Sequence, residues 1–293
     1  MIHKNKGFFR TVVRFFAIIL LLSMMLVGCV EEEPKRDFPA VNQNQANANS
    51  QGKNTSKKTE KSTSKKTEEN TSKKTEATTS AQNNSNGKKR VAITYDDGPH
   101  VERTKLIVDE LAKYGFNATF FVVGNRVDGT KYSGGEAVKY AASKGNEIAI
   151  HAYTHDYYYH TCDDATYKSE LSDTHKAILA KVPNAKVNLM RPVGGNITPK
   201  RVEECDYAVI MWSVDSNDWK YKNDGEAGVE AIVDNVMSQV RDGSIILMHD
   251  IYENTYLATK KILKELNSQG YDVVTVSELF GSVEAGIKYS KAT

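Results

Sequence analysis

The chain has 293 residues and a formal net charge of +2, from 39 basic and 37 acidic residues. The charge is uneven: residues 1–29 carry +4, residues 30–89 carry another +4, and residues 90–293 carry −6. A domain with net negative charge lacks the basic surface that a phosphate backbone requires, so we expect no nucleic-acid partner. The length allows one large domain with extensions, and a monomer is the default expectation.

The first 29 residues have the pattern of an export signal. Four basic residues precede an apolar run of 13 residues, 15–27, which is shorter than the roughly 20 residues that span a membrane. The run leads into Leu26-Val27-Gly28-Cys29, which resembles a bacterial lipobox. We therefore expect residues 1–29 to be a lipoprotein signal peptide, with Cys29 acylated and the protein held at the outer face of the cell membrane, facing the wall. An ordinary signal peptide and an uncleaved anchor are the alternatives.

Residues 30–89 are predicted to be a disordered linker. The segment has one aromatic residue, Phe38, and an eight-residue repeat at 54–61, 62–69 and 70–77 that contains Thr-Ser-Lys-Lys-Thr-Glu each time. Such a segment buries too little apolar surface to offset the entropy of ordering. A flexible tether of this length has an r.m.s. span of roughly 40 Å, which suits a domain that works away from the membrane surface.

Residues 90–293 have the sequence pattern of a folded domain. Short runs rich in Val, Ile, Phe and Tyr predict strands at 91–95, 118–123, 147–150, 188–190, 207–214, 244–248 and 271–276. Amphipathic stretches between them predict helices at 104–114, 167–182, 228–240 and 256–266. This alternation predicts a parallel sheet covered by helices, as in a barrel or a doubly wound sheet.

Ionisable residues follow five of these strands, at the carboxyl end of each. Parallel strands collect such side chains at one edge, where (β/α) barrels build their active sites. No Gly-x-Gly-x-x-Gly follows a strand, which disfavours a dinucleotide-binding fold. We therefore expect an α/β domain that forms an incomplete or distorted (β/α) barrel with about seven βα units.

Each polar motif is ambiguous by itself. Asp96-Asp97-Gly98-Pro99 is typical of a turn. His151 and His155 have the spacing that places two imidazoles on one side of a helical turn, and Ala152 in place of Glu excludes a zincin.

Taken together and in chain order, the motifs resemble those of the polysaccharide deacetylases, the NodB-like carbohydrate esterases. The resemblance covers about 90–280. It rests on Thr94-Tyr95-Asp96-Asp97-Gly98-Pro99, His151-x-x-x-His155, Arg191-Pro192-Val193-Gly194-Gly195, Asp215-x-x-Asp218-Trp219 and Leu247-Met248-His249-Asp250. Two positions depart from the family pattern: Ala152 replaces a Ser or Thr whose hydroxyl would brace the metal loop, and Val193 replaces a Pro.

The resemblance implies a metal site and an acid–base pair. Asp97, His151 and His155 would hold one divalent cation, with Zn²⁺ expected first and Co²⁺, Mn²⁺, Ni²⁺ or Fe²⁺ compatible with the same ligands. That cation would lower the pKa of its water and polarise the acetyl carbonyl. Asp96 would be the general base and His249 the general acid that protonates the departing amine.

Further roles follow from the same resemblance. Arg191 would hold Asp96 ionised and oriented, and Asp218 would pair with His249 and raise its pKa. Trp219 and Leu247 would line the pocket for the acetyl methyl, and Gly195 is assigned to substrate binding with them. Three consecutive tyrosines, 157–159, either stack on sugar rings or belong to the core or surface.

The expected function is removal of N-acetyl groups from N-acetylglucosamine units of a cell-surface polysaccharide, with peptidoglycan as the first expected polymer. An O-acetyl xylan or chitooligosaccharide deacetylase is the alternative among enzymes. A catalytically inactive lipoprotein that binds wall glycan is the alternative from another class, motivated by Ala152 and Val193. The two cysteines of the domain, Cys162 and Cys205, either form a disulfide or stay as free thiols.

Overall fold

The computed structural model describes residues 87–292. The predicted signal peptide, the predicted lipidation at Cys29 and the repeats of the linker lie outside these residues. Within 87–292, no helix has both the length and the hydropathy needed to cross a membrane. The first strand begins at Lys89, one residue inside the range predicted as linker.

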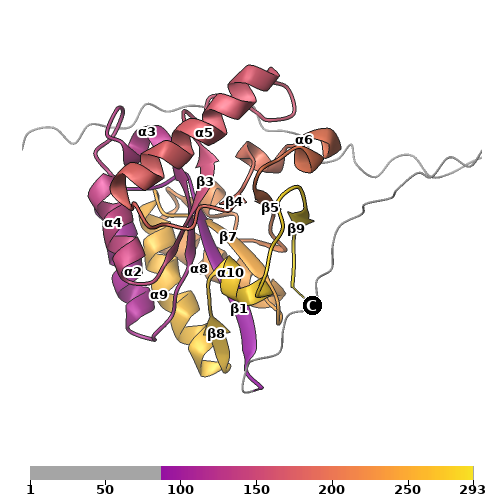
Figure 1. The fold of residues 1–293 in the computed structure, drawn as a ribbon. Coiled ribbons are helices and arrows are strands. Elements are labelled where there is room, and N and C mark those ends of the chain that lie inside the picture. The colour runs from indigo at the N-terminus through magenta and orange to yellow at the C-terminus, as the bar shows by residue number, and fades with distance from the viewer. Residues whose placement is uncertain (1–86, 293) are drawn as a thin grey trace, which may run out of the picture. The chain divides into compact units, whose positions relative to one another are not determined.

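One sheet of nine parallel strands organises residues 87–292 (Figure 1). The strand order is β6-β7-β1-β2-β3-β4-β5-β9, and β8 pairs with the first half of β1. The strands are β1 (Lys89–Asp96), β2 (Thr119–Val123), β3 (Glu147–Ala152), β4 (Leu189–Met190), β5 (Ala208–Ile210), β6 (Val214–Asp215), β7 (Ile245–His249), β8 (Tyr271–Val273) and β9 (Lys288–Tyr289).

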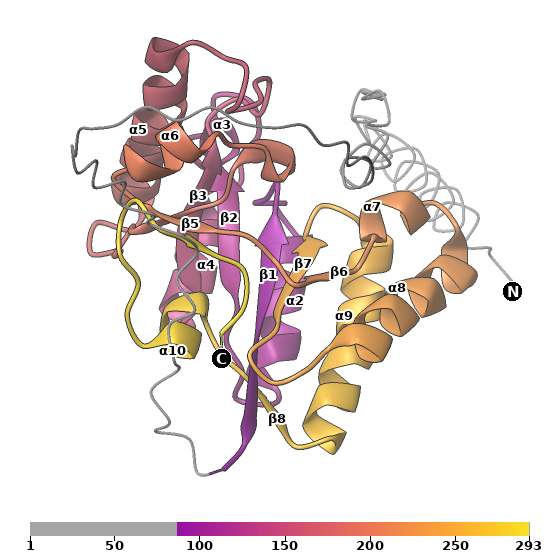
Figure 2. The ribbon, with the colours of Figure 1, turned by 90° about the vertical axis from the view of Figure 1, so that its right-hand side faces the viewer.

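Helices cover the outer face of the sheet (Figure 2). The helices are α2 (Arg103–Ala112), α3 (Gly124–Val127), α4 (Gly135–Ser143), α5 (Asp164–Lys181), α6 (Pro199–Glu203), α7 (Asp218–Tyr221), α8 (Gly225–Gln239), α9 (Glu253–Ser268) and α10 (Val276–Phe280), with a 3₁₀ turn η2 (Val193–Gly195). The larger helices contact one another in the spatial order α8, α9, α2, α4, α5. The prediction of an incomplete (β/α) barrel is confirmed.

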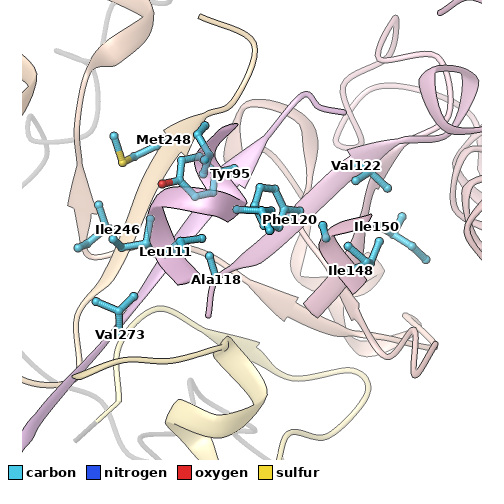
Figure 3. Packing of buried hydrophobic residues seen from close by; sticks show 14 of the residues in the cluster. Tyr95, Leu111, Ala118, Phe120, Val122, Ile148, Ile150, Ile246, Met248 and Val273 are labelled. Carbon is cyan, nitrogen blue, oxygen red and sulfur yellow. The ribbon is translucent and has the colours of Figure 1, made fainter. Parts of the chain in front are cut away.

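The main core lies between the sheet and these helices. Side chains alternate between the two faces of a strand, so every second residue points outward. Figure 3 shows the result for Tyr95 of β1, Phe120 of β2 and Ile246 of β7, which pack beside Leu111 of α2. Each of these four side chains is at most 1% exposed.

The inner face of the sheet is divided into an apolar and a polar half. Ala92 of β1 and Ile245 of β7 pair near the amino ends and belong to a second core, which Phe280 and Tyr289 of the C-terminal segment complete. Further along the same strands and on the same face, Asp96 pairs with His249. The carboxyl ends of the strands are therefore the polar end of the barrel interior, as predicted.

One predicted strand is wrong. The apolar run 207–214 forms two strands, β5 and β6, which lie toward opposite ends of the strand order although only residues 211–213 separate them in the chain. The linking residues join the two ends of the strand order, since the N–H of Met211 donates to Tyr289 of β9 and the N–H of Ser213 donates to Ile245 of β7. The run 271–276 is also shorter than predicted, because Thr275 caps α10 and ends the strand region at Val273.

We expect the C-terminal segment to stabilise the fold through Phe280. Its ring is 1% exposed and packs edge-to-face on Tyr289, with 5.0 Å between ring centroids. Phe280→Ala should lower the free energy of unfolding by about 3–5 kcal/mol, because it leaves a cavity in the second core. Urea denaturation followed by circular dichroism measures the change.

The control is Leu106→Ala on α2, where the side chain is 41% exposed. This variant should stay within about 0.5 kcal/mol of the unsubstituted protein, as surface substitutions usually do. Equal losses in both variants would contradict a core function for the C-terminal segment.

Candidate active site

Strands β1 and β3 bring together the three side chains that the motifs assign to a metal. Asp97 directly follows β1, His151 is the penultimate residue of β3, and His155 lies in the loop after it. The Nε2 atoms of His151 and His155 lie 3.3 and 3.1 Å from Oδ1 of Asp97. One ligand atom from each residue lies within 4.8 Å of the other two, so a single cation can contact all three.

The two histidines follow the third predicted strand, as expected, and they do not share a helical turn although their spacing is compatible with one. His151 belongs to a strand, and His155 has a left-handed backbone with a φ of 66°. Asp97 is also left-handed, with a φ of 69°. Non-glycine residues adopt this conformation at an energetic cost, and such residues concentrate at functional sites. A loop, rather than a helix, brings the second imidazole back beside the first.

The orientation of His151 fits a divalent cation. Its Nδ1 lies 2.9 Å from the carbonyl oxygen of Arg191, and since a carbonyl only accepts, Nδ1 carries the proton. Nε2 therefore presents its lone pair toward Asp97 and His155. Metal-binding imidazoles typically make this outer hydrogen bond, and two histidines with one carboxylate are a common ligand set.

The charges at this point also favour a cation. Burial would raise the pKa of Asp97, but the positive charge of His155 and the hydrogen bond from that imidazole hold it well below its usual range. Burial would lower the pKa of His155, and the charge of Asp97 reverses this and raises it. A positive charge is thus stabilised where the three ligand atoms meet.

Asp96, the predicted base, is paired with a buried arginine. Nη1 of Arg191 donates to Asp96 Oδ1 at 2.7 Å, and Arg191 has no exposed surface. The same Nη1 lies 2.7 Å from the hydroxyl of Thr94, which fixes the guanidinium against β1. The second carboxylate oxygen of Asp96 lies 4.0 Å from Nδ1 of His151, on the side of the predicted metal ligands.

His249, the predicted acid, is paired with a buried carboxylate. Its Nδ1 lies 2.7 Å from Oδ1 of Asp218, and its backbone N–H donates to the other oxygen at 2.7 Å. The hydroxyl of Thr255 on α9 also donates to Asp218, at 2.7 Å. Burial would lower the pKa of His249, but the charge of Asp218 outweighs it and raises that pKa to about 10. The imidazole therefore holds its proton at neutral pH.

The three predicted substrate-binding residues have different surroundings. Trp219 lies in α7, directly after Asp218, with 45% of its surface exposed. Leu247 is 5% exposed on β7. Gly195 has a φ of 71°, and a Cβ there would lie 2.8 Å from the indole of Trp212, so this turn requires glycine.

The structure shows the surroundings of the tyrosines after His155 and of the two cysteines. Tyr157 is 46% exposed, whereas Tyr159 is fully buried and donates its hydroxyl to the carbonyl oxygen of His151 at 3.0 Å. Tyr159 is thus a core residue that supports the site. Cys162 and Cys205 are free thiols, which answers the question of a disulfide that their spacing left open.

Three buried residues next to the site were not assigned roles from the sequence. Thr255 contacts Asp218, and Glu170 contacts the loop between the two histidines. Asp250 is buried beside Thr104, and burial raises its pKa to about 7. Glu170 lies on a helix 15 residues after His155, and Thr255 follows the Leu247–Asp250 motif by five residues, but neither residue belongs to a motif. Asp250 was marked only by its position after His249.

Known proteins share this fold and sequence. The sequence model described as polysaccharide deacetylase matches residues 83–209. The peptidoglycan-N-acetylmuramic acid deacetylase PdaC of Bacillus subtilis is 38% identical over 192 residues, which are 66% of this chain and 39% of PdaC. A peptidoglycan-N-acetylglucosamine deacetylase of Bacillus cereus is 37% identical over 202 residues, which are 66% of this chain and 89% of that relative.

The solved structures agree with this comparison. The structure of PdaC superimposes with a TM-score of 0.60 and 36% identity, over 66% of this chain and 90% of that one. A family 4 acetyl xylan esterase from Clostridium thermocellum, solved with a cobalt ion, gives a TM-score of 0.62 and 28% identity, over 69% of this chain and 98% of that one. From its sequence and its fold, the chain belongs to the polysaccharide deacetylase family.

Proposed function

We propose that this protein is a metal-dependent hydrolase that removes N-acetyl groups from N-acetylglucosamine units of peptidoglycan. The observation that carries the proposal is the placement of an arginine-paired carboxylate and an aspartate-paired imidazole beside one candidate metal site. Asp96 and His249 are paired in register on the neighbouring strands β1 and β7, so a base and an acid lie side by side at the carboxyl edge of the sheet. Amide hydrolysis needs both, one to take a proton from water and one to give a proton to the leaving amine.

We assign the cation to Asp97, His151 and His155, with Zn²⁺ as the first candidate and Co²⁺, Mn²⁺, Ni²⁺ or Fe²⁺ also accepted by such ligands. When bound, it supplies Lewis acidity, which lowers the pKa of water and polarises a carbonyl. The neutral imidazoles required of the ligands are compatible with the hydrogen bond from His151 Nδ1 to the carbonyl of Arg191.

The side chains then divide the proton transfers. Asp96 accepts a proton from the attacking water, and Arg191 keeps that carboxylate in place through the contact at 2.7 Å. His249 gives its Nε2 proton to the amine nitrogen as the bond from carbon to nitrogen breaks, while Asp218 stabilises the protonated imidazole. One water is consumed, and the products are acetate and a free glucosamine amine.

The substrate and the location are proposed together. Two relatives are named for peptidoglycan, and the predicted lipid anchor at Cys29 with the linker 30–89 would place the domain at the wall. The chain spans about two fifths of the length of the first relatives, so the substrate of those longer proteins enters here as part of the proposal. The relatives also include a bifunctional xylanase/deacetylase and a chitooligosaccharide deacetylase, so O-acetyl xylan and chitooligosaccharide are the alternative substrates.

The first test is release of acetate from purified peptidoglycan. We expect release to stop with a chelator, to return with Zn²⁺ or Co²⁺, and to fall by about 10²–10⁴-fold in Asp96→Asn, because the amide cannot accept the proton. Glu136→Gln, which changes an exposed ion pair with Lys139 on α4, is the matched control and should keep full activity.

The pattern of release separates the alternatives. Release from acetylated xylan or chitooligosaccharide alone would keep the chemistry and change the substrate. No release from any of the three polymers by the metal-loaded protein would refute the hydrolase and favour a wall-glycan-binding lipoprotein.

A second test concerns the pH dependence of kcat/KM. The acid works only while His249 is protonated, and Asp218 raises the pKa of that imidazole. Asp218→Asn removes the negative charge, so the decline of activity at alkaline pH should move to lower pH by roughly 1–3 units. Asp215→Asn, in which the lost carboxylate contacts the backbone of Asn217, is the control and should shift the decline much less. An unchanged alkaline decline in Asp218→Asn would argue against His249 as the acid.

The location has its own test. Cys29→Ala removes the thiol that an acyl chain would modify. We expect the unsubstituted protein in the membrane fraction and the detergent phase, and Cys29→Ala in the aqueous phase or the medium. Equal distribution of the two would contradict a lipid anchor at this residue.

A further inference from the structure

The loop between the two histidines is held by a carboxylate from a different element. Glu170 lies in α5, only 4% exposed, and its Oε2 accepts hydrogen bonds from the backbone N–H groups of Tyr153 and Thr154 at 2.8 and 2.9 Å. Its other oxygen accepts from the Thr154 hydroxyl at 2.7 Å. Within residues 87–292, Glu170 has no cation as an ion-pair partner, so these three donors offset the cost of burying its charge.

The same loop is fixed on its other sides. The hydroxyl of Thr154 accepts from the backbone N–H of Asp156 at 3.2 Å, and the carbonyl of Tyr153 accepts from the N–H of Asn125 at 3.0 Å. His155 therefore lies between Thr154, whose backbone N–H and hydroxyl both donate to Glu170, and Asp156, whose backbone N–H donates to the Thr154 hydroxyl.

This restraint acts on a strained backbone. His155 has a φ of 66°, a conformation that is unfavourable for an L-residue and persists only when its surroundings impose it. At position 152, where the family pattern has a hydroxyl, this chain has an alanine with no exposed surface, packed in the core beneath the helices. The hydroxyl that braces the loop here belongs to Thr154, two residues further on.

We infer that Glu170 is a positioning residue of the metal site: through Thr154 and the backbone of Tyr153, it holds His155 in the conformation that completes the ligand set. The inference rests on the proposed binding of a cation by Asp97, His151 and His155. It requires no direct contact between Glu170 and the cation or the substrate.

The test is Co²⁺ binding to the full-length protein, read from the affinity and from the visible absorption spectrum of the bound ion. Glu170→Ala should weaken Co²⁺ binding by about 10-fold and change the spectrum. This is the lower end of the range for groups bonded directly to metal ligands, because Glu170 acts on His155 through Thr154. Glu170→Gln keeps an amide oxygen for the two backbone donors and should bind within about threefold of the unsubstituted protein, since both of those hydrogen bonds survive.

A matched control is Glu147→Ala at the other end of β3. Glu147 is a partly buried glutamate, which accepts from the hydroxyl of Thr119 at 2.8 Å and from the backbone N–H of Ser277 at 3.2 Å. It should lower the melting temperature of the metal-free protein, as Glu170→Ala should, but leave Co²⁺ affinity within about twofold, because distant sites act independently.

The outcomes are distinct. A folded Glu170→Ala with unchanged affinity and spectrum would overturn the inference, as would an equal loss of affinity in Glu147→Ala. If Glu170→Ala does not fold, Thr154→Val takes its place, because it removes only the linking hydroxyl. Thr154→Val should weaken Co²⁺ binding, and Thr154→Ser, which keeps the hydroxyl, should bind as the unsubstituted protein does. Unchanged binding in Thr154→Val would overturn the inference. Failure of the unsubstituted protein to bind Co²⁺ would refute the proposed metal site itself, whereas binding without acetate release would refute only the proposed reaction.

Discussion

The guanidinium of Arg191 is a buried charge: the residue has no exposed surface, and the strands of the candidate active site surround it. Its guanidinium lies 4.2 Å from the ring centroid of Phe121 on β2. It donates to four partners: Thr94 and Asp96 on β1, and the carbonyls of Ile210 and Met211 at the end of β5. A buried charge is tolerated only with such partners, and removing one typically costs about 3–5 kcal/mol. Because its own carbonyl accepts from His151, the same residue orients the base and a metal ligand.

This polar centre depends on the apolar half beneath it. The C-terminal segment fills the amino-terminal half of the barrel interior with Phe280 and Tyr289, so water is excluded there and the strands keep their spacing. The carboxyl half is left for side chains with charge, and every chemical candidate lies in it. The candidate catalytic residues are therefore confined to the carboxyl ends of the strands, as in (β/α) barrels generally, where the opposite end contributes to stability.

Three buried carboxylates illustrate how surroundings assign a role to one residue type. Asp96 faces a guanidinium, Asp218 faces an imidazole and Glu170 faces only backbone and hydroxyl donors. The first is suited to accept a proton, the second raises the pKa of His249 to about 10, and the third holds a loop. Neighbouring groups, rather than the carboxylate itself, separate base, charge partner and brace.

The alternation of strands and helices and the barrel class are predictable from the residues alone, because local periodicity reports which face of a strand is buried. The cluster of Asp96, Asp97, His151, Arg191 and His249 is predictable too, because the carboxyl ends of parallel strands share one edge of the sheet. Other features become visible only in the folded chain: 207–214 forms two strands, Tyr159 belongs to the core and the cysteines are free thiols. The left-handed backbone of His155 and the hydrogen bonds of its loop to Glu170 belong to the same group. These features arise from sheet curvature and from contacts between residues distant in the chain, neither of which leaves a periodic pattern in the residues themselves.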